Sequence, residues 1–135
     1  MKKSHLIILI VVLIIVSWLF IRFVIGGDED TWIKDEKGIY IKHGAPSETP
    51  DYVLEQQRAI VQAQIFYNTA KNNGIIFSSQ CLGSFEDYAF DIVHVPRNEE
   101  DNKIGNQCED YRNGLVKHFI ELDKDGNIVK IEKSF

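Results

Sequence analysis

A long apolar run near the amino terminus constrains this chain more than any other feature. Residues 6–25 are apolar apart from Ser17 and Arg22. A helix of this length rises about 30 Å, which matches the hydrocarbon core of a bilayer, and it satisfies its own backbone hydrogen bonds in lipid. The run therefore predicts a transmembrane signal-anchor over residues 1–27, with the lipid bilayer as the partner of residues 6–25.

The charges on either side of the run predict its orientation. Lys2 and Lys3 precede the run, whereas Asp28, Glu29 and Asp30 follow it. Because basic residues favour the cytoplasmic side, we expect a single-pass cell-membrane protein with a cytoplasmic amino terminus and an extracytoplasmic carboxyl-terminal domain. The alternative is a cleaved signal peptide that releases a secreted factor. The run exceeds the usual 7–15 apolar residues of a signal peptide, and no A-x-A site follows it, so a retained anchor is favoured.

The remainder of the chain, residues 28–135, has the size of one domain and is acidic. It contains all 20 acidic residues and 12 of the 15 basic ones, which gives it a formal charge of −8. Nucleic acid is excluded as a partner by this charge, because a phosphate backbone requires a basic surface. A basic partner or cations would be attracted instead.

Residues 28–50 are predicted to form a membrane-proximal β-hairpin and a linker. The apolar-rich segments 32–34 and 39–42 flank the turn sequence Asp35-Glu36-Lys37-Gly38. Residues 43–50 then contain Gly44, Pro46 and Pro50, which interrupt regular structure.

A helix is predicted over residues 51–71, at the start of an extracytoplasmic α+β domain that spans residues 51–135. Thr49 suits the N-cap, Pro50 the first helical position and Asp51 the positive end of the helix dipole. Asn72-Asn73-Gly74 ends the helix. Apolar positions recur at intervals of three and four residues and form one stripe: Tyr52/Val53, Ala59/Ile60, Ala63, Phe66/Tyr67 and Ala70.

Strands are predicted at residues 75–77, 85–95, 115–122 and 128–132. The last two flank Asp123-Lys124-Asp125-Gly126-Asn127, which is typical of a hairpin turn. Residues 97–107 are polar and irregular in pattern. The predicted fold class is α+β: an N-terminal transmembrane helix followed by a small domain with one long amphipathic helix packed on an antiparallel β-sheet.

Cys81 and Cys108, the two cysteines of the chain, are predicted to form a disulfide. Oxidation is permitted outside the cytoplasm, and closing a loop of 28 residues contributes roughly 3.5 kcal/mol by the chain-entropy argument. A thiol nucleophile and a metal site are the alternatives, but neither cysteine belongs to a CxxC pair.

Other residues that could carry chemistry have simpler structural interpretations. His43, His94 and His118 fit surface or core positions, although a Cys/His/Asp arrangement that includes Asp91 can be drawn. The acidic string 99–101 could bind a cation such as calcium, or it could be a solvated loop. No catalytic, cofactor-binding or metal-binding residue is therefore predicted.

A resemblance is carried by residues 31–135. The string from Trp32 through Gly38-Ile39-Tyr40-Ile41-Lys42-His43-Gly44-Ala45-Pro46-Ser47 resembles the membrane-proximal hairpin of uncharacterised single-anchor exported proteins of candidate-phylum bacteria and some archaea. Residues 81–83, 87–97 and 108–111 are similar to the same group. The resemblance implies no activity and no site residues.

The predicted function is an extracytoplasmic binding or structural domain without an evident catalytic site, whose partner is an extracytoplasmic protein or envelope component. The alternative is an envelope enzyme that uses a metal or a thiol of Cys81 or Cys108.

Overall fold

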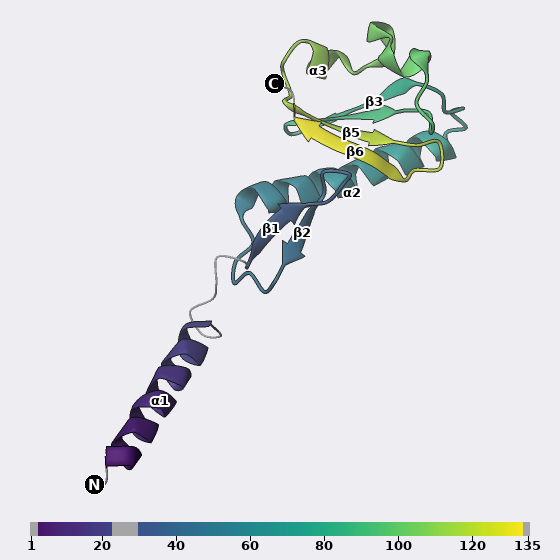
Figure 1. Cartoon of the computed structure of the whole chain (residues 1–135). Helices are drawn as coiled ribbons and strands as arrows, with labels where there is room; N and C mark the ends of the chain where they lie inside the picture. Colours follow the sequence, from purple (N-terminus) through teal and green to yellow (C-terminus); the bar gives the residue numbers. More distant parts are fainter. Residues whose placement is uncertain (1–2, 23–29, 134–135) are drawn as a thin grey trace. The chain divides into compact units, whose positions relative to one another are not determined.

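A computed structural model describes residues 3–22 and 30–133 of the chain (Figure 1). The chain divides into two compact units: residues 1–32 with 42–48, and residues 33–41 with 49–135. The second unit contains the four-stranded sheet and every residue of the site described below.

The first element, α1 (Lys3–Phe20), is an α-helix of 18 residues. It ends five residues before the predicted run does; Ile21 and Arg22 continue as a wider π-helical turn, and residues 23–29 lie outside the described part. Eighteen residues rise about 27 Å, less than the roughly 30 Å of a hydrocarbon core. Within the described ranges, no helix is both long and apolar enough to cross a membrane. The prediction of a transmembrane helix over residues 6–25 is therefore wrong.

A two-stranded sheet follows, formed by β1 (Thr31–Lys34) and β2 (Tyr40–His43). The side chain of Asp35 closes the predicted turn, because its Oδ1 accepts hydrogen bonds from the backbone N–H groups of Lys37 and Ile39 at 2.9 and 2.8 Å. Gly38 has a φ of +84°, and a Cβ at this position would lie 2.2 Å from the carbonyl oxygen of Ile131. Only glycine fits this turn without displacement of the backbone.

The long helix α2 (Asp51–Asn72) has nearly the predicted bounds. Its N-cap lies one residue later than expected, at Pro50 instead of Thr49, and no side-chain hydrogen bond caps the helix. At the other end Gly74 has a φ of +75°, and the N–H of Ile75 donates to the carbonyl of Ala70 at 3.1 Å. This Schellman ending confirms the predicted stop.

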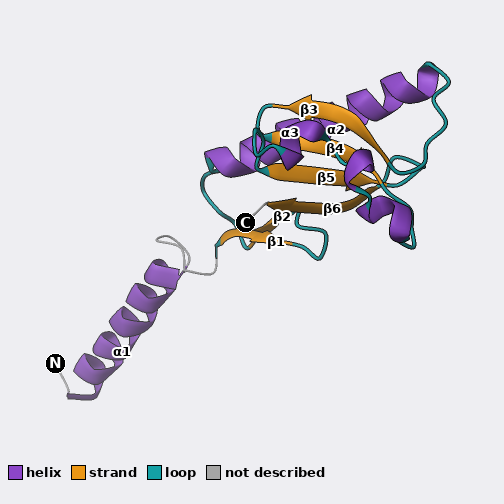
Figure 2. Ribbon diagram, turned by 90° about the horizontal axis from the view of Figure 1, so that it is seen from above, coloured by secondary structure: helices purple, strands orange, loops and turns teal. Residues whose placement is uncertain are grey.

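Four strands form the main sheet, in the order β3 (Gln80–Phe85), β4 (Tyr88–Ile92), β5 (His118–Leu122) and β6 (Ile128–Lys133) (Figure 2). The β3–β4 and β5–β6 pairs are antiparallel hairpins, but β4 and β5 are parallel. The α+β class is confirmed, and the purely antiparallel sheet is wrong. Residues 93–117 cause the difference, because they return the chain to the starting end of β4 before β5 begins.

One face of the sheet packs against α2 and forms the main core. Alternate residues of each strand point to this face, and the stripe on α2 covers them. The buried members are Ala59, Ala63, Tyr67, Tyr88, Phe90, Ile92, Ile120, Leu122 and Ile131.

The opposite face is covered by residues 93–117, which contain the 3-10 helices η2 (Glu99–Asn102) and η3 (Ile104–Asn106) and the short helix α3 (Glu109–Arg112). Figure 1 shows α2 and α3 on opposite sides of the sheet. A second apolar cluster lies here, formed by Ala89, Cys108 and Val116 with Tyr111 and Phe119. This second face positions the candidate site.

Candidate functional site

A cavity of about 180 Å³ lies on the face of the sheet opposite α2. We call it the Asp91 cavity; the residues that give it its chemistry are Asp91, Arg97, Asp101, Tyr111, Phe119 and Glu121. A larger hollow of about 450 Å³ adjoins it and shares Val93, Arg97, Phe119 and Glu121.

Two buried carboxylates on neighbouring strands line the Asp91 cavity. Asp91 on β4 is the register partner of Glu121 on β5, so both side chains point to the same face. Asp91 is 8% exposed and Glu121 is 5% exposed. Burying a charge is costly unless it is paired and hydrogen-bonded, so the partners of these two groups determine what the site can do.

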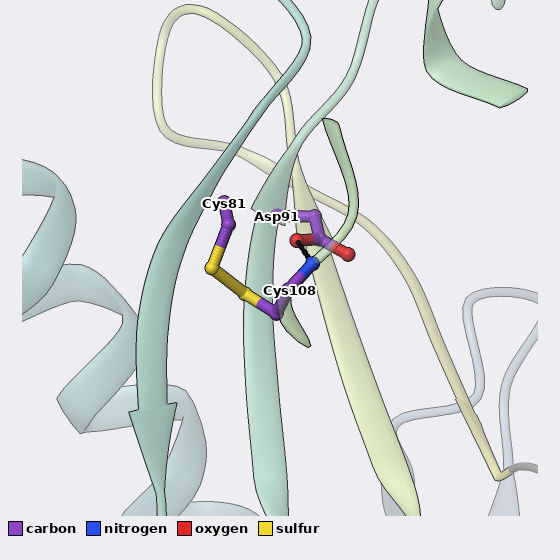
Figure 3. Close-up of side chains that lie close together, drawn as sticks. All are labelled: Cys81, Asp91 and Cys108. Atoms are coloured by element: carbon purple, nitrogen blue, oxygen red, sulfur yellow. Dashed lines mark hydrogen bonds between the residues drawn. A yellow bond between two sulfur atoms is a disulfide. The ribbon is translucent and has the colours of Figure 1, made fainter. Parts of the chain in front are cut away.

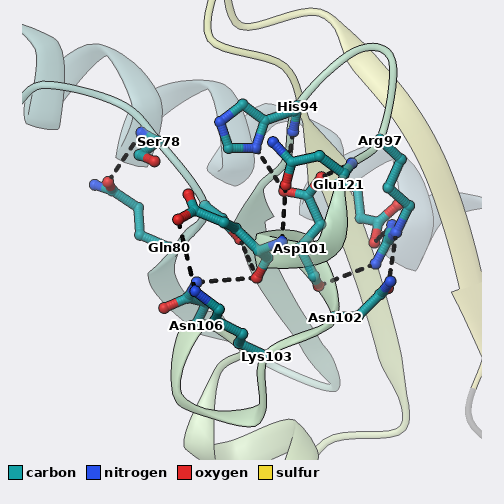
Figure 4. A network of polar contacts seen from close by, with 12 residues as sticks. Ser78, Gln80, His94, Arg97, Asp101, Asn102, Lys103, Asn106 and Glu121 are labelled. Atoms are coloured by element: carbon teal, nitrogen blue, oxygen red, sulfur yellow. Dashed lines mark hydrogen bonds and ion pairs between the residues drawn. The ribbon is translucent and has the colours of Figure 1, made fainter.

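Arg97 compensates the charge of Glu121. Its Nη1 donates to Glu121 Oε1 at 2.6 Å, its Nη2 donates to the carbonyl of Asp101 at 3.2 Å, and its Nε donates to Asn102 at 3.2 Å (Figure 4). The hydrogen bond to Glu121 raises the pKa of Arg97 and outweighs the opposing effect of burial. The guanidinium is thus fixed between β5 and η2.

Within residues 3–22 and 30–133, Asp91 forms no ion pair of this kind. Its Oδ1 accepts one hydrogen bond, from the backbone N–H of Cys108 at 3.2 Å, and among the described residues no group donates to Oδ2. Burial, with a contribution from Glu121, raises the pKa of Asp91 to about 6, although the Cys108 N–H and Arg97 oppose the shift. Near neutral pH, Asp91 is therefore a buried carboxylate whose charge no ion pair among the described residues balances.

Asp101, which is 2% exposed, has a different environment. Burial acts to raise its pKa, but hydrogen bonds from the N–H of Asn98 at 2.8 Å and from the ring and N–H of His94 at 3.0 and 3.1 Å hold the pKa below its usual value. With the side chain of Asn98 it forms a capping box at the start of η2. The acidic string 99–101 therefore contributes to folding through Asp101, and among the described residues it forms no group of three metal ligands.

Two aromatic rings bound the cavity. Tyr111 and Phe119 meet edge to face, with ring centroids 5.1 Å apart. Burial, together with the negative charges of Glu132, Asp91 and Glu121, raises the pKa of Tyr111. Its hydroxyl therefore remains protonated at neutral pH.

The predicted cysteine pair lies beside Asp91. The Sγ atoms of Cys81 and Cys108 are 1.95 Å apart and form a disulfide. Both sulfurs and a carboxylate oxygen of Asp91 lie within 4.8 Å of one another (Figure 3). Both sulfurs are consumed in the disulfide and are not thiolates, so this group is not a metal site in its oxidised form.

The three histidines named from the sequence lie in different environments. His43 is exposed on β2, His94 contacts Asp101, and His118 stacks on Tyr88 with ring centroids 4.7 Å apart. His118 begins β5, whereas His94 follows the end of β4, so the two lie at opposite ends of this strand pair.

Sequence reasoning missed Glu121 and Arg97, and it named Asp91 only as a possible member of a catalytic arrangement. One signal was present in the sequence: Asp91 and Glu121 each stand between two large apolar residues of a predicted strand. A charged residue inside such a segment indicates a polar group on the second face of a sheet covered on both sides.

Comparisons of the chain with protein-family models, with curated proteins and with solved structures give no match.

Proposed function

We propose that this chain presents an extracytoplasmic binding domain whose Asp91 cavity receives a small cationic group, such as the ammonium or guanidinium end of a partner molecule. The observation that carries the proposal is the state of Asp91. This carboxylate lines the cavity, is 8% exposed, and keeps one oxygen without a hydrogen-bond donor among the described residues.

The charge balance of the cavity selects a cation over an anion. Asp91, Asp101 and Glu121 contribute three carboxylates against the single guanidinium of Arg97. A cation beside Asp91 would offset the cost of burying that charge, whereas an anion would add to it. The charge of −8 on residues 28–135 favours the approach of basic molecules in the same way.

The size and the aromatic walls of the cavity favour an end group over a whole ligand. A volume of about 180 Å³ lies below the roughly 300–1,000 Å³ of sites that enclose drug-sized molecules. Tyr111 and Phe119 provide ring surface, on which a desolvated cation gains about 0.5–2 kcal/mol. The rest of the partner would extend into the adjoining hollow, whose lining includes Glu132 and Lys130.

The disulfide supports placing this domain outside the cytoplasm, because disulfides persist in oxidising compartments and are rare in reducing ones.

A titration with small basic probes tests the proposal. The full chain, labelled with ¹⁵N, is titrated with Nα-acetyl-lysine amide and Nα-acetyl-arginine amide, and Nα-acetyl-norleucine amide serves as a neutral control. We expect the basic probes alone to shift the amide signals of Asp91, Cys108, Tyr111 and Phe119. Asp91→Asn should raise the Kd at least tenfold, a loss of about 1.4 kcal/mol.

The matched control is Asp125→Asn, the same chemical change at a carboxylate whose side chain is 65% exposed. It should leave binding unchanged. The proposal is overturned if the neutral probe binds as well as the basic ones, or if Asp91→Asn leaves the Kd where it was.

A further inference from the structure

The two residues of the Cys81–Cys108 disulfide differ in exposure. Cys81 is exposed on β3, which is an edge strand, whereas Cys108 is 1% exposed. Thiol–disulfide exchange proceeds by attack of a thiolate on one sulfur and departure of the other. An incoming thiolate therefore reaches Cys81, and Cys108 is the sulfur that leaves.

The surroundings of Cys108 suit a thiol better than a thiolate. Its Sγ lies 3.3 Å from the carbonyl oxygen of Gly83 and 3.4 Å from that of Phe90. A thiol can donate a hydrogen to either oxygen, but a thiolate would face two negative dipole ends in a cluster that also contains Ala89 and Val116. The departing sulfur consequently needs a proton.

Asp91 is placed to supply that proton. It is the register partner of Cys81 across β3 and β4, and a carboxylate oxygen lies within 4.8 Å of both sulfurs. Its Oδ1 accepts the N–H of Cys108, which holds the carboxyl group beside the residue whose sulfur leaves (Figure 3). A buried carboxyl group that remains partly protonated in weakly acidic solution can act as a general acid.

We propose that Cys81–Cys108 is an exchangeable disulfide, with Asp91 as the acid that protonates the departing sulfur of Cys108. A thiolate of an external reductant, a small thiol or a dithiol protein, attacks Cys81 Sγ. The Sγ–Sγ bond breaks, a mixed disulfide forms at Cys81, and Cys108 Sγ takes the carboxyl proton of Asp91. A second thiolate then attacks the reductant's sulfur and releases the Cys81 thiolate and the oxidised reductant. Solvent returns a proton to Asp91.

This exchange goes beyond cation binding and does not depend on it. If the exchange occurs, an external thiol can reduce the disulfide bond that joins β3 to Cys108 at the start of α3. The reverse sequence uses the same groups: the Asp91 carboxylate accepts the proton of the Cys108 thiol, and the resulting thiolate attacks a mixed disulfide at Cys81.

The expected pH dependence follows from the groups that face Asp91. Glu121 on β5 favours its protonated form, Arg97 favours its ionised form, and Asp101 on η2 and Tyr111 on α3 share the cavity. The protonated form of Asp91 carries the reaction. The rate constant for reduction of the disulfide, calculated per thiolate of the reductant, should therefore rise as the pH falls through about 6.

Reduction kinetics of the full chain test the proposal. Dithiothreitol is added between pH 5 and pH 8, samples are quenched with acid, and free thiols are labelled with a maleimide and counted by mass spectrometry. From pH 8 to pH 5, the rate constant per thiolate should rise at least tenfold in the wild type and stay flat in Asp91→Asn. The matched control Asp125→Asn should follow the wild type.

Two further measurements separate exchange in the folded protein from reduction after unfolding. The rate should be first order in dithiothreitol and insensitive to urea below the unfolding transition. With oxidised glutathione, Cys108→Ser should form a mixed disulfide at Cys81, and Cys81→Ser should form little at Cys108. A rate that saturates at the unfolding rate, a mixed disulfide mainly at Cys108, or an unchanged pH profile in Asp91→Asn overturns the proposal.

Discussion

Asp91→Asn should stabilise the fold at pH 8, although it replaces a buried hydrogen-bonded residue. The amide has nearly the shape of the carboxylate, and its oxygen can still accept the N–H of Cys108. The substitution removes the charge that burial disfavours and leaves the pair formed by Arg97 and Glu121 in place.

The pKa of Asp91 sets the expected gain in the free energy of unfolding. It is raised from 3.8 to about 6 in the folded chain. Each unit by which a pKa differs between the folded and unfolded chains is worth about 1.4 kcal/mol, so the ionised carboxylate costs the fold at most about 3 kcal/mol. Since the amide must itself be desolvated, we expect a gain of about 1–3 kcal/mol in the free energy of unfolding.

The size of this gain depends on pH. Between pH 4 and pH 6 the folded chain holds more protons at Asp91 than the unfolded chain does, so the contribution of this group to stability falls as the pH rises through that interval. Below about pH 4 both states are protonated and the penalty disappears. The advantage of Asp91→Asn should therefore be largest above pH 7 and smallest near pH 4.

Urea unfolding of the oxidised protein at pH 4, 5, 6, 7 and 8 measures this difference, with Asp125→Asn as the exposed control. The argument from desolvation would be refuted by an Asp91→Asn variant that is less stable than the wild type at pH 8. It would also be refuted if the variant exceeded the wild type in free energy of unfolding by as much at pH 4 as at pH 8.

Three further substitutions test the fold. Gln56→Ala should cost about 2–4 kcal/mol, because the buried amide bonds one backbone donor and one backbone acceptor of the hairpin at 2.8 and 2.9 Å; urea unfolding beside the exposed Gln57→Ala checks it. Gly126→Ala should destabilise by more than 1 kcal/mol, since its φ is +86° and a Cβ would lie 2.6 Å from Tyr67, whereas Gly105→Ala, with open space, should be nearly neutral in thermal melts. Serine at both cysteines should lower the free energy of unfolding by roughly 3.5 kcal/mol in denaturant, and no change would show that the disulfide bears little on folding.

Local turn chemistry made much of the fold predictable. Asp123 closes the last hairpin by accepting the N–H groups of Asp125 and Asn127, each at 2.9 Å, and Asp35 does the same in the first hairpin. Gly74 ends α2 as expected. In each case the signal lies within a few residues of its effect.

The parallel pairing of β4 and β5 was not predictable in this way. It depends on the path of residues 93–117, whose polar composition resembles a simple loop. Their structure comes from buried polar contacts such as those of Asp101 and Arg97, which reach to other elements and leave no periodic pattern in the sequence.

The amino-terminal prediction was wrong because hydrophobicity alone does not set the bounds of a helix. The apolar run continues to residue 25, but the described α-helix ends at Phe20.

The candidate site was predictable only in part. The disulfide was predictable because the chain has two cysteines, and the structure confirms it. Asp91 is a candidate site residue because Glu121 lies beside it and because Arg97 forms its hydrogen bond with Glu121 instead of Asp91. Both contacts require β5 to pair with β4, which the sequence did not predict.

An NMR titration of the Asp91 side-chain carboxyl carbon in the full chain, with and without saturating Nα-acetyl-lysine amide, tests directly whether the Asp91 cavity binds a cationic group. An uncompensated buried carboxylate that receives a cation should titrate with a pKa of about 6 in the free protein and clearly lower with the probe bound. A pKa near 4 in the free protein, or one that the probe leaves unmoved, would contradict the assignment of this cavity as a site for cationic groups.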